Sequence, residues 1–279
     1  MGEIKIGTCS WSDHTGFYPP GMKPTDRISY YARHFPVVEV DSTYYHMQPA
    51  RNFAAWASRT PPGFVFDVKA YKAMTRHERT PQETTPLPIA EVFRRFAESL
   101  DPLRQTARLG AILLQFPPWF VESEENRSYL RFCREALPDF VLAVEFRHRS
   151  WFEGEARDRT LGFLRAFDFV HVVVDAPQVG TGTVPLVAAV TNQKLSVFRL
   201  HGRNRATWYA RTETSGQRFD YRYTQKELEG FLPVIERLAE KTGEVHVLMN
   251  NNREDFAVRN AYELSALLDL GYPNPFPAT

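Results

Sequence analysis

Eight short apolar runs divide the chain, and each has the length of a β-strand. They lie near Ile4–Cys9, Val37–Tyr45, Phe64–Tyr71, Gly110–Phe116, Val141–Phe146, His171–Asp175, Val197–Leu200 and Val245–Met249. Successive side chains of a strand point to opposite faces. In seven of the runs, this alternation places the polar side chains on one face, close to the C-terminal end, and leaves the other face apolar. The pattern predicts strands that are covered by helices on one side and carry a polar site at one end.

The alternation assigns particular residues to the polar face. Glu145 shares it with Arg147 in the fifth run, and Arg199 shares it with His201 in the seventh. On the corresponding face of the other runs, the alternation places Glu39 with Asp41, Asp67 with Lys69, Gln115, His171 with Asp175, and Thr8 with Ile4 and Ile6. We therefore expect a ring of charged and polar side chains at the C-terminal ends of the strands.

Helical patterns separate most of the runs. They cover about Thr25–Phe35, Asn52–Ser58, Ala90–Leu100, Leu130–Leu137, Leu161–Phe167, Thr224–Lys241 and Asp255–Leu268. Thr224 and Glu227 have the spacing of a capping box, and Gly243 is the expected stop of that helix. Strands that alternate with helices pair in parallel. The predicted fold is therefore α/β, a TIM-like (β/α)8 barrel.

One connection departs from the alternation. Residues 177–194, after the sixth run, are rich in glycine and proline and hold only a short apolar piece, so an irregular sixth connection is expected. Long loops, which are often functional, follow two other runs at Lys72–Pro88 and Gly202–Tyr223. The proline-rich tail, residues 272–279, is expected on the surface.

Length and charge narrow the class of protein. The chain has 279 residues, and one such barrel needs roughly 250 residues, so residues 1–279 are expected to form a single domain. The formal net charge is only +1, from 34 basic and 33 acidic residues. Overall charge therefore gives no reason to expect a nucleic-acid or membrane partner, and any anion site must be local.

Cysteine usage and hydropathy predict the compartment. The two cysteines, Cys9 and Cys133, lie far apart without a CxxC motif, which is typical of a reducing environment. The sequence has no apolar signal core, and its apolar runs fall short of the roughly 20 residues that span a membrane. A cytoplasmic protein without membrane contact is expected.

Two segments carry the strongest candidate chemistry. Glu145 with Arg147, and Arg199 with His201 and Arg203, combine a carboxylate, an imidazole and guanidinium groups at strand ends. One interpretation is a salt-bridge network that holds the barrel interior together. The other is an acid/base pair beside cations that hold an anion. The two interpretations are compatible, and the sequence leaves both open.

Lys69 and an asparagine run extend this set. Lys69 ends an apolar strand, where it could hold an anion, act as a base or form a Schiff base, or simply pair with Asp67 or Glu39. Asn250 and Asn251 suit the orientation of hydroxyl or carbonyl groups, although asparagines also favour turns. Glu39, Asp41, Gln115 and Asp175 complete the expected ring.

A divalent metal is an alternative use of the same carboxylates. Its ligands would be Glu39, Asp41, Glu145, Asp175 and His201. They would come from different strands, because no HExxH spacing occurs, and the neighbouring cations would repel a dication. No nucleotide-cofactor motif is present: GxxxxGK[ST] is absent, and the GTGT sequence at 180–183 is too weak a signal to predict a phosphate loop.

Many short motifs along the chain resemble one known family. They are Ile6-Gly7-Thr8-Cys9-Ser10-Trp11, Phe17-Tyr18-Pro19, Tyr30-Tyr31-Ala32 with Phe35, Val38 to Tyr45, Trp56 with Thr60-Pro61, Phe64 to Lys69, Leu114-Gln115-Phe116-Pro117-Pro118, Val144 to His148 with Ser150-Trp151, Arg199 to Arg203, and Asn250-Asn251 with Ala257 and Asn260-Ala261. In order and spacing these resemble the domain-of-unknown-function 72 family, the YecE-like proteins, from about residue 4 to 268.

The resemblance implies a TIM-like barrel, but it implies no reaction, because the family is named for lacking one. Barrels of this kind are loosely similar to the endonuclease IV and xylose isomerase group, which uses carboxylate and histidine metal sites; fold alone does not transfer that chemistry. The chain departs from the family pattern at Cys9-Ser10, where Ser-Gly is common, and at Asp41, where asparagine is frequent.

Three functional hypotheses follow. The first is an enzyme that acts by acid/base chemistry on a small anionic substrate, phosphorylated or acidic and sugar-like. Its catalytic groups would be Glu145, His201, Asp175 and Lys69. Its substrate-binding groups would be Arg147, Arg199, Arg203, Gln115, Asn250, Asn251, Glu39 and Asp41, with a wall formed by Trp11, Tyr45, Trp151 and Trp208.

The second hypothesis is a metal-dependent phosphodiesterase that acts on nucleic acid. It needs a basic stripe outside the barrel mouth, which Arg203, Arg205, Arg211, Arg218 and Arg222 could supply. The third is a non-catalytic ligand-binding or interaction protein. The expected burial of many charges argues against this hypothesis, because buried charges are costly and usually serve a function. The sequence predicts no oligomeric state.

Overall fold

Eight parallel strands close into one barrel. The computed structural model describes residues 1–80, 84–210 and 219–276. The strands are β1 (Glu3–Cys9), β2 (Val37–Val40), β3 (Val65–Lys69), β4 (Leu109–Gln115), β5 (Leu142–Glu145), β6 (Phe169–Asp175), β7 (Leu195–Leu200) and β8 (Glu244–Met249). Each strand pairs in parallel with its neighbour along the chain, and β8 pairs with β1. The predicted (β/α)8 architecture is confirmed.

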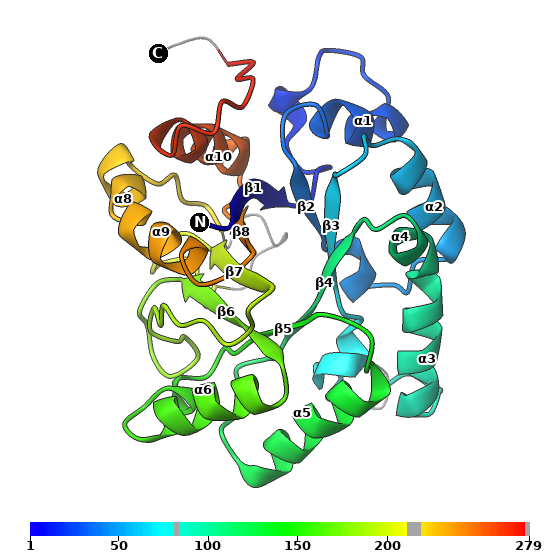
Figure 1. The fold of residues 1–279 in the computed structure, drawn as a ribbon, viewed down its shortest axis with the longest axis vertical. Helices are drawn as coiled ribbons and strands as arrows, with labels where there is room; N and C mark the ends of the chain where they lie inside the picture. The colour runs from blue at the N-terminus through cyan, green and yellow to red at the C-terminus, as the bar shows by residue number, and fades with distance from the viewer. Residues whose placement is uncertain (81–83, 211–218, 277–279) are drawn as a thin grey trace.

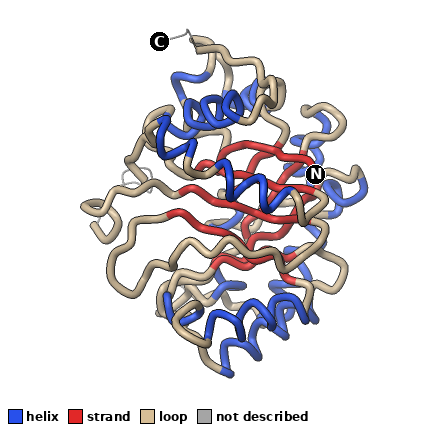
Figure 2. The backbone as a smooth tube through the Cα atoms, turned by 60° about the vertical axis from the view of Figure 1, so that its left-hand side comes forward, coloured by secondary structure: helices blue, strands red, loops and turns tan. Residues whose placement is uncertain are grey.

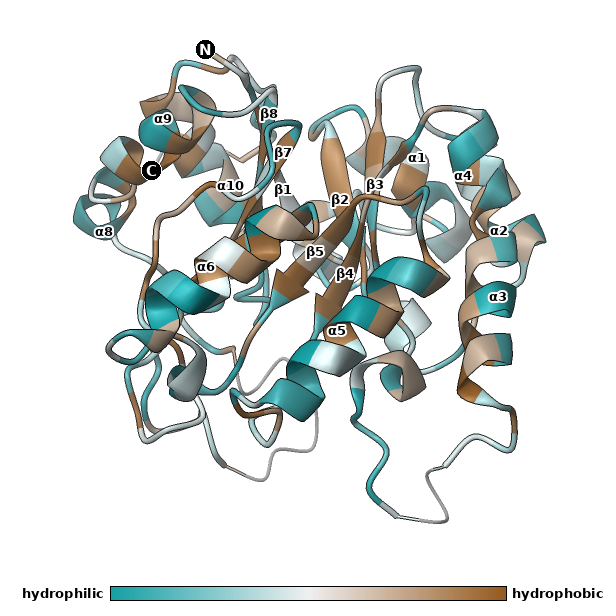
Figure 3. Ribbon diagram, turned by 60° about the horizontal axis from the view of Figure 1, so that its bottom comes forward, coloured by the Kyte–Doolittle hydropathy of each residue, from teal (hydrophilic) through white to brown (hydrophobic). Residues whose placement is uncertain are grey.

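Helices surround the ring of strands (Figure 1). They are α1 (Arg27–Tyr31), α2 (Ala50–Ser58), α3 (Ile89–Ser99), α4 (Asp101–Gln105), α5 (Glu124–Ala136), α6 (Ala156–Ala166), α8 (Gln225–Glu229), α9 (Leu232–Ala239) and α10 (Phe256–Leu267). In α3, for example, Val92, Phe93 and Phe96 recur at helical spacing and are buried, whereas its charged residues face outward. Figure 3, coloured by hydropathy, shows strands that are mostly hydrophobic and helices that carry both hydrophobic and hydrophilic residues.

Several predicted boundaries are wrong. The second strand ends at Val40 rather than Tyr45, because the chain turns into a short 3-10 helix at Ser42–Tyr44. The helix expected over 224–241 is two helices, α8 and α9, and it ends at Ala239 rather than at Gly243. Pro233 at the start of α9 cannot donate the backbone hydrogen bond that would continue α8. The capping box of Thr224 and Glu227 is present as predicted.

The sixth connection is irregular, as expected. Residues 176–194, all of them described, form neither helix nor strand and run as a loop from β6 to β7 (Figure 2). The His171 ring lies 2.9 Å from the carbonyl oxygen of Val187, and the Thr191 hydroxyl accepts from the His171 amide and donates to the Phe169 carbonyl. The His171 ring thus pairs with one backbone carbonyl of the loop, and the Thr191 side chain fixes the loop to the backbone of β6.

An ion network closes the N-terminal end of the barrel interior. His246 on β8 lies 2.7 Å from a carboxylate oxygen of Asp67 on β3 and 3.2 Å from Glu244, which pairs in turn with Lys5 on β1 at 2.9 Å. Burial by itself would lower the pKa of His246, but Asp67 and Glu244 raise it to about 9. Gly110 makes room for this network, since a Cβ there would lie 2.4 Å from Asp67.

The opposite end of the barrel carries the long loops. In Figure 3 the arrowheads of β4 and β5 point toward the lower side of the view, where these loops gather.

Within the described ranges, no helix has both the length and the apolar composition that a membrane crossing requires.

Candidate active site at the barrel mouth

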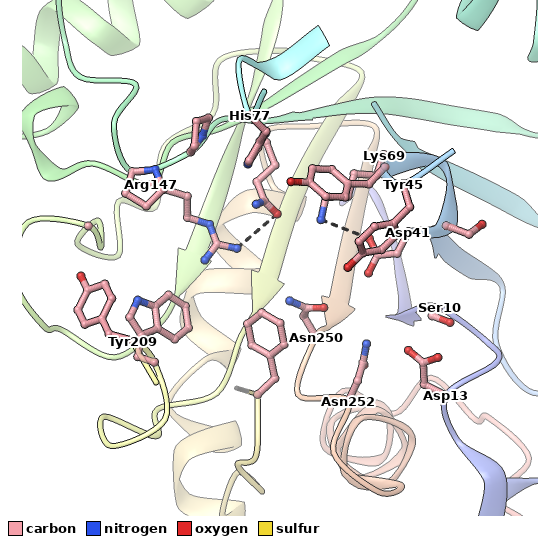
Figure 4. Close-up of a pocket in the computed structure, with 18 of the residues that line it drawn as sticks. Ser10, Asp13, Asp41, Tyr45, Lys69, His77, Arg147, Tyr209, Asn250 and Asn252 are labelled. Carbon is pink, nitrogen blue, oxygen red and sulfur yellow. Dashed lines mark hydrogen bonds and ion pairs between the residues drawn. The ribbon is translucent and has the colours of Figure 1, made fainter. Parts of the chain in front are cut away.

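A cavity of about 700 Å³ opens at the C-terminal ends of the strands. Residues at or after the C-terminal ends of all eight strands contribute to its wall. Among them are Ser10, Asp41, Lys69, Arg147, Trp208 and Asn250. The C-terminal end is where barrel enzymes place their catalytic groups. Figure 4 shows these side chains directed toward one another across the cavity.

A fully buried guanidinium lies directly beneath this cavity. Nη2 of Arg199 is 2.6 Å from Glu39, and Nη1 is 2.5 Å from Glu145 and 3.3 Å from the Gln115 side chain. The Cys9 thiol lies 3.4 Å from the same guanidinium. Arg199, Glu39 and Glu145 each have 0% exposed surface. This arrangement is the buried salt-bridge network that the sequence allowed.

The second oxygen of Glu145 links this network to the cavity. It lies 2.5 Å from Nε of Arg147 and 3.2 Å from Nε2 of His201. Asn250 approaches the other imidazole nitrogen at 2.7 Å. Nη2 of Arg147 also lies 3.2 Å from Nε2. Glu145 and Asn250 therefore orient the imidazole and the Arg147 guanidinium.

The electrostatics divide the acidic groups into two kinds. Burial alone would raise the pKa of Glu145, but Arg147, Arg199 and His201 hold it well below its usual range. Burial, with repulsion from Asp41, raises the pKa of Glu39 well above its usual range in spite of Arg199. The second oxygen of Glu39 finds no hydrogen-bond partner in the described part of the chain. Glu145 is therefore a carboxylate, and Glu39 is the group that tends to hold a proton.

Two neutral imidazoles flank these charges. Burial, followed by the positive charge of Arg147, lowers the pKa of His201 to about 3. Burial also lowers the pKa of His77 to about 3, and Lys69 and Arg147 add to the effect. His77 lines the cavity, and its Nδ1 lies 2.8 Å from the Thr75 hydroxyl. Both rings are therefore uncharged near neutral pH.

Lys69 and Asp41 form the ion pair that reaches the cavity. The Lys69 ammonium lies 3.7 Å from the Asp41 carboxylate and 4.9 Å above the ring of Tyr44. Burial would raise the pKa of Asp41, but Lys69 overcomes this and keeps it below its usual range. Figure 4 shows this pair on one side of the cavity and Arg147, bonded to Gln115, on the other.

The structure separates the predicted site residues into groups. Lys69, Asp41, Gln115, Arg147, Tyr45, Asn250 and Trp208 line the cavity. Glu39, Glu145, Arg199 and His201 lie beneath it and are buried. Of the four predicted catalytic residues, only Lys69 therefore reaches the space where a substrate would bind.

Asp175 and Arg203 do not belong to this site. Strand register pairs Val174 with Arg199, so Val174 faces the barrel interior and Asp175 faces outward. The Asp175 carboxylate accepts hydrogen bonds from Arg203 at 2.8 Å and from the Tyr223 hydroxyl at 2.7 Å. The face assigned to the sixth run was wrong, and this pair anchors the loop after β7 instead.

The face assigned to the first run was wrong as well. Register pairs Cys9 with Glu39, so Cys9 points inward. Thr8 points outward and hydrogen-bonds the Tyr31 hydroxyl at 2.9 Å.

Three further predicted residues lie outside the cavity. The Trp151 ring stacks on Phe146 at 4.1 Å in the outer layer, and Trp11 packs edge-on against Trp56. Asn251 donates to the Tyr221 carbonyl and to Asn260, which is a structural role. The substrate-wall role predicted for Trp11 and Trp151 is not supported.

The candidate metal ligands do not converge. In the described residues, no group of three or more histidine, cysteine, aspartate or glutamate side chains is placed to share an ion. Asp175 faces away, and Glu39 and Glu145 both bind Arg199. The five predicted ligands therefore do not fit a metal site.

The expected basic stripe is partly neutralised. Arg203 pairs with Asp175 and Glu227, and Arg222 lies 2.6 Å from Glu263. Arg211 and Arg218 lie outside the described residues.

Several cavity residues were missed by the sequence-based prediction. They are Ser10, Ser12, Asp13, Trp119, Tyr209 and Phe219. Most lie in irregular segments beyond the strand ends, where alternation says nothing about direction. Ser10 adopts a left-handed backbone conformation, with a φ of 76°.

Comparisons with known proteins agree with the early resemblance. The family described as "Protein of unknown function DUF72" matches residues 5–279. The UPF0759 protein YunF of Bacillus subtilis (strain 168) is 39% identical over 279 residues, covering 98% of each chain. A crystal structure of a DUF72 family protein from Enterococcus faecalis V583 superposes with a TM-score of 0.88 at 31% identity, covering 99% of both chains.

A second crystal structure supports the same assignment. A DUF72 family protein from Thermotoga maritima MSB8 has a TM-score of 0.82 and 33% identity, covering 96% of this chain and 99% of that one. The match over nearly the whole length, together with the barrel and its mouth, shows that the chain belongs to the DUF72 family.

Proposed function

We propose that this protein is an enzyme that acts on a small anionic substrate, phosphorylated or acidic and sugar-like, by acid/base chemistry at the barrel mouth. One observation carries the proposal: Lys69 and Arg147 both line the same cavity, while the carboxylates that neutralise Arg199 stay buried beneath it. A substrate anion can therefore approach two cations without meeting Glu39 or Glu145.

The charge balance at the cavity floor supports an anion. The floor holds three cations, Lys69, Arg147 and Arg199, against the carboxylates Glu145 and Asp41 and the Glu39 carboxyl, whose pKa is raised by burial. When Glu39 holds its proton, one positive charge is left over. Guanidinium and ammonium groups in a partly dehydrated cavity bind phosphate and carboxylate more strongly than they do in water.

The acid/base role falls to Asp41 and Lys69 rather than to Glu145 and His201. Asp41 is ionised, lies on the cavity wall and has a proton donor, Lys69, 3.7 Å away. An ionised carboxylate can accept a proton from a substrate, and the neighbouring ammonium stabilises negative charge that develops beside it. Glu145 acts through Arg147, whose guanidinium it orients, and is a positioning residue.

Thermal unfolding with inorganic phosphate and with hexuronic acids tests the binding half. These anions should raise the melting temperature of the wild type, and Lys69→Met and Arg147→Lys should reduce the shift. The matched control is Lys226→Met, because Lys226 is an exposed lysine on α8, away from the cavity. A shift that Lys69→Met and Arg147→Lys leave unchanged would refute the anion site.

Proton exchange tests the catalytic half. Candidate sugar phosphates and sugar acids are incubated with the protein in heavy water, and deuterium uptake is followed by NMR. Asp41→Asn should abolish uptake and keep binding. Tight binding without any uptake or turnover across the panel would favour the alternative of a non-catalytic binding protein.

A further inference from the structure

The exposed aromatic rings of the described residues gather at one place. Tyr45, Trp119 and Tyr209 are 55%, 45% and 58% exposed, and all three line the cavity. They come from three different connections, after β2, β4 and β7. The other exposed large apolar side chains in the described ranges are aliphatic and do not line it. Exposed rings that converge on one cavity mark a binding surface.

These rings are held in position although they face solvent. The Trp119 indole N–H donates to the Arg76 carbonyl at 3.0 Å, and the Arg79 guanidinium lies 4.6 Å from the ring centre. The Tyr209 hydroxyl donates to the Val179 carbonyl at 2.9 Å. A ring whose orientation is already fixed loses little entropy when a ligand stacks on it.

Gly182 leaves room for the Tyr209 ring. A Cβ at this glycine would lie 2.8 Å from the Tyr209 hydroxyl oxygen. The rings of Tyr45 and Tyr44 lie nearly perpendicular with their centres 5.0 Å apart, and Tyr45 keeps 55% of its surface exposed.

Small polar groups form another part of the wall. Ser10, Ser12, Asp13 and Asn252 line the cavity, and Figure 4 shows Ser10, Asp13 and Asn252 on the side away from Arg147 and Tyr209. The buried side-chain oxygen of Asn252 has no hydrogen-bond partner in the described part of the chain, while its amide donates to the Cys9 carbonyl. The Asp13 carboxylate adds acceptors and would repel a second anionic group there.

The cavity is therefore polarised. Its floor carries Lys69 and Arg147, and its outer part offers aromatic faces with hydroxyl groups, an amide oxygen and a carboxylate. A polyanion such as a nucleic-acid strand would meet Asp13. A sugar ring has apolar C–H faces that stack on aromatic rings and hydroxyl groups that donate to carboxylate and amide oxygens.

We propose that the outer part of this cavity is a subsite for a neutral carbohydrate ring, which Tyr45, Trp119 and Tyr209 hold by stacking and Asp13 and Asn252 hold through its hydroxyl groups. The inference specifies the substrate of the proposed function, and it rests on that function only for the binding of the substrate's anionic group. The substrate class is then a hexose that carries one phosphate or carboxylate group, bound with that group at Lys69 and Arg147.

Isothermal titration calorimetry on the full chain tests this subsite. Inorganic phosphate, hexose 6-phosphates, neutral hexoses and nucleoside 5′-monophosphates are titrated in parallel. At least one hexose 6-phosphate should bind about tenfold or more tightly than inorganic phosphate. Tyr45→Ala and Trp119→Ala should remove that gain and leave the affinity for inorganic phosphate unchanged.

Two further variants serve as controls. Trp119→Phe keeps a ring and should retain much of the gain. Leu186→Ala removes an exposed apolar side chain outside the cavity and should change nothing. The Tyr45 side chain contacts the ring of Tyr44 and is 55% exposed, so Tyr45→Ala is expected to fold even if Trp119→Ala does not.

The outcomes separate this inference from the proposed function. Equal affinities for hexose 6-phosphates and inorganic phosphate, or a gain that Tyr45→Ala and Trp119→Ala leave intact, would overturn the subsite and keep the anion site. Binding of neutral hexoses that depends on Trp119, without any binding of phosphate, would support the subsite and refute the anion site. A gain confined to nucleoside monophosphates would overturn the carbohydrate assignment.

Discussion

The guanidinium of Arg199 lies 2.5 Å from the Glu145 carboxylate, and both side chains are fully buried beneath the cavity. The pair joins β7 to β5 across the barrel interior, and Glu39 extends it to β2. Because Glu145 also contacts Arg147, the same carboxylate anchors the interior and orients a cation at the mouth. One residue therefore links the buried network to the orientation of a cation at the cavity.

Removal of the Arg199 charge should destabilise the fold strongly. Arg199→Met removes the cation that contacts Glu39 and leaves Glu145 only its contacts with Arg147 and His201. Breaking a buried ion pair costs about 3–5 kcal/mol of unfolding free energy. Urea unfolding measures the change. Arg222→Met removes one partner of an exposed pair with Glu263 and should cost about 0–1 kcal/mol. A loss below about 1 kcal/mol for Arg199→Met would contradict the buried network.

A second variant tests the cause of that loss. Arg199→Met combined with Glu39→Gln removes the cation together with one of the acids that it neutralises. The double variant should recover part of the lost free energy of unfolding, because an amide is buried without first having to take up a proton, as the Glu39 carboxyl group must. No recovery would indicate that packing, rather than charge, explains the effect.

Stability should fall at alkaline pH because of His246. Its pKa is about 9 in the folded chain, above its ordinary value of 6.5. The folded state therefore binds this proton more tightly, so the stabilisation is complete below about pH 6.5 and is lost as the pH rises through about 9. The expected loss is about 3 kcal/mol. Free energies of unfolding from pH 6 to pH 10, about one pH unit apart, would measure it.

The variant His246→Gln checks this assignment. It should lower stability at neutral pH and remove the alkaline decline, because the imidazole is no longer there to lose a proton. His46→Gln, at an exposed histidine, should keep the decline. An unchanged alkaline decline in His246→Gln would show that another group titrates.

Asp41 should oppose the binding of anions. It lies on the cavity wall beside Lys69 and carries a negative charge there. Asp41→Asn removes that charge, so affinity for inorganic phosphate should rise, by about tenfold. Asp13→Asn, at the outer part of the cavity, should raise it less. Calorimetric titration at fixed ionic strength measures both, and an equal or larger effect of Asp13→Asn would contradict the polarised cavity.

Gly202 should tolerate no side chain. Its φ is +82°, and a Cβ would lie 2.6 Å from Cβ of Tyr221. Gly202→Ala combines left-handed strain with a clash and should cost about 2–3 kcal/mol. Gly63 has a φ of +84° with open space around it, so Gly63→Ala should cost only about 1 kcal/mol. Thermal unfolding compares them, and equal losses would refute the clash.

The surroundings of Gly202 explain why a glycine stands there. The Tyr221 side chain occupies the space where a Cβ would lie, and the Gly202 amide donates to the Tyr223 hydroxyl at 2.8 Å. Its role is to pack the loop that follows β7.

The barrel and most of the inward-facing charges could be predicted from local pattern. Glu145, Arg199 and Lys69 interrupt apolar strands at alternating positions, and the structure confirms that these strands pair in parallel and that the charges face the interior. The reason is that periodicity belongs to the strand itself. The helix over Asp255–Leu268 was predicted within one residue of each end for the same reason.

Tertiary structure alone decided the faces of β1 and β6. A polar residue marks one face of a strand but does not reveal whether that face points inward, because outer-layer side chains can also bind it: Thr8 hydrogen-bonds the Tyr31 hydroxyl, and Asp175 the Tyr223 hydroxyl. Pairing of Cys9 with Glu39 and of Val174 with Arg199 settles it. Asp175, which has the same chemistry as Glu145, therefore lies outside the mouth.

The residues of the cavity wall likewise could not be predicted from local sequence patterns. Asp13, Trp119 and Tyr209 lie in irregular segments far apart in sequence, and only closure of the barrel brings them to one mouth. The sequence by itself determined the repeating strands and helices and the charges that alternate along the strands. The register between strands, and with it the division between buried anchors and groups that face the cavity, depended on contacts between distant residues, which no local period encodes.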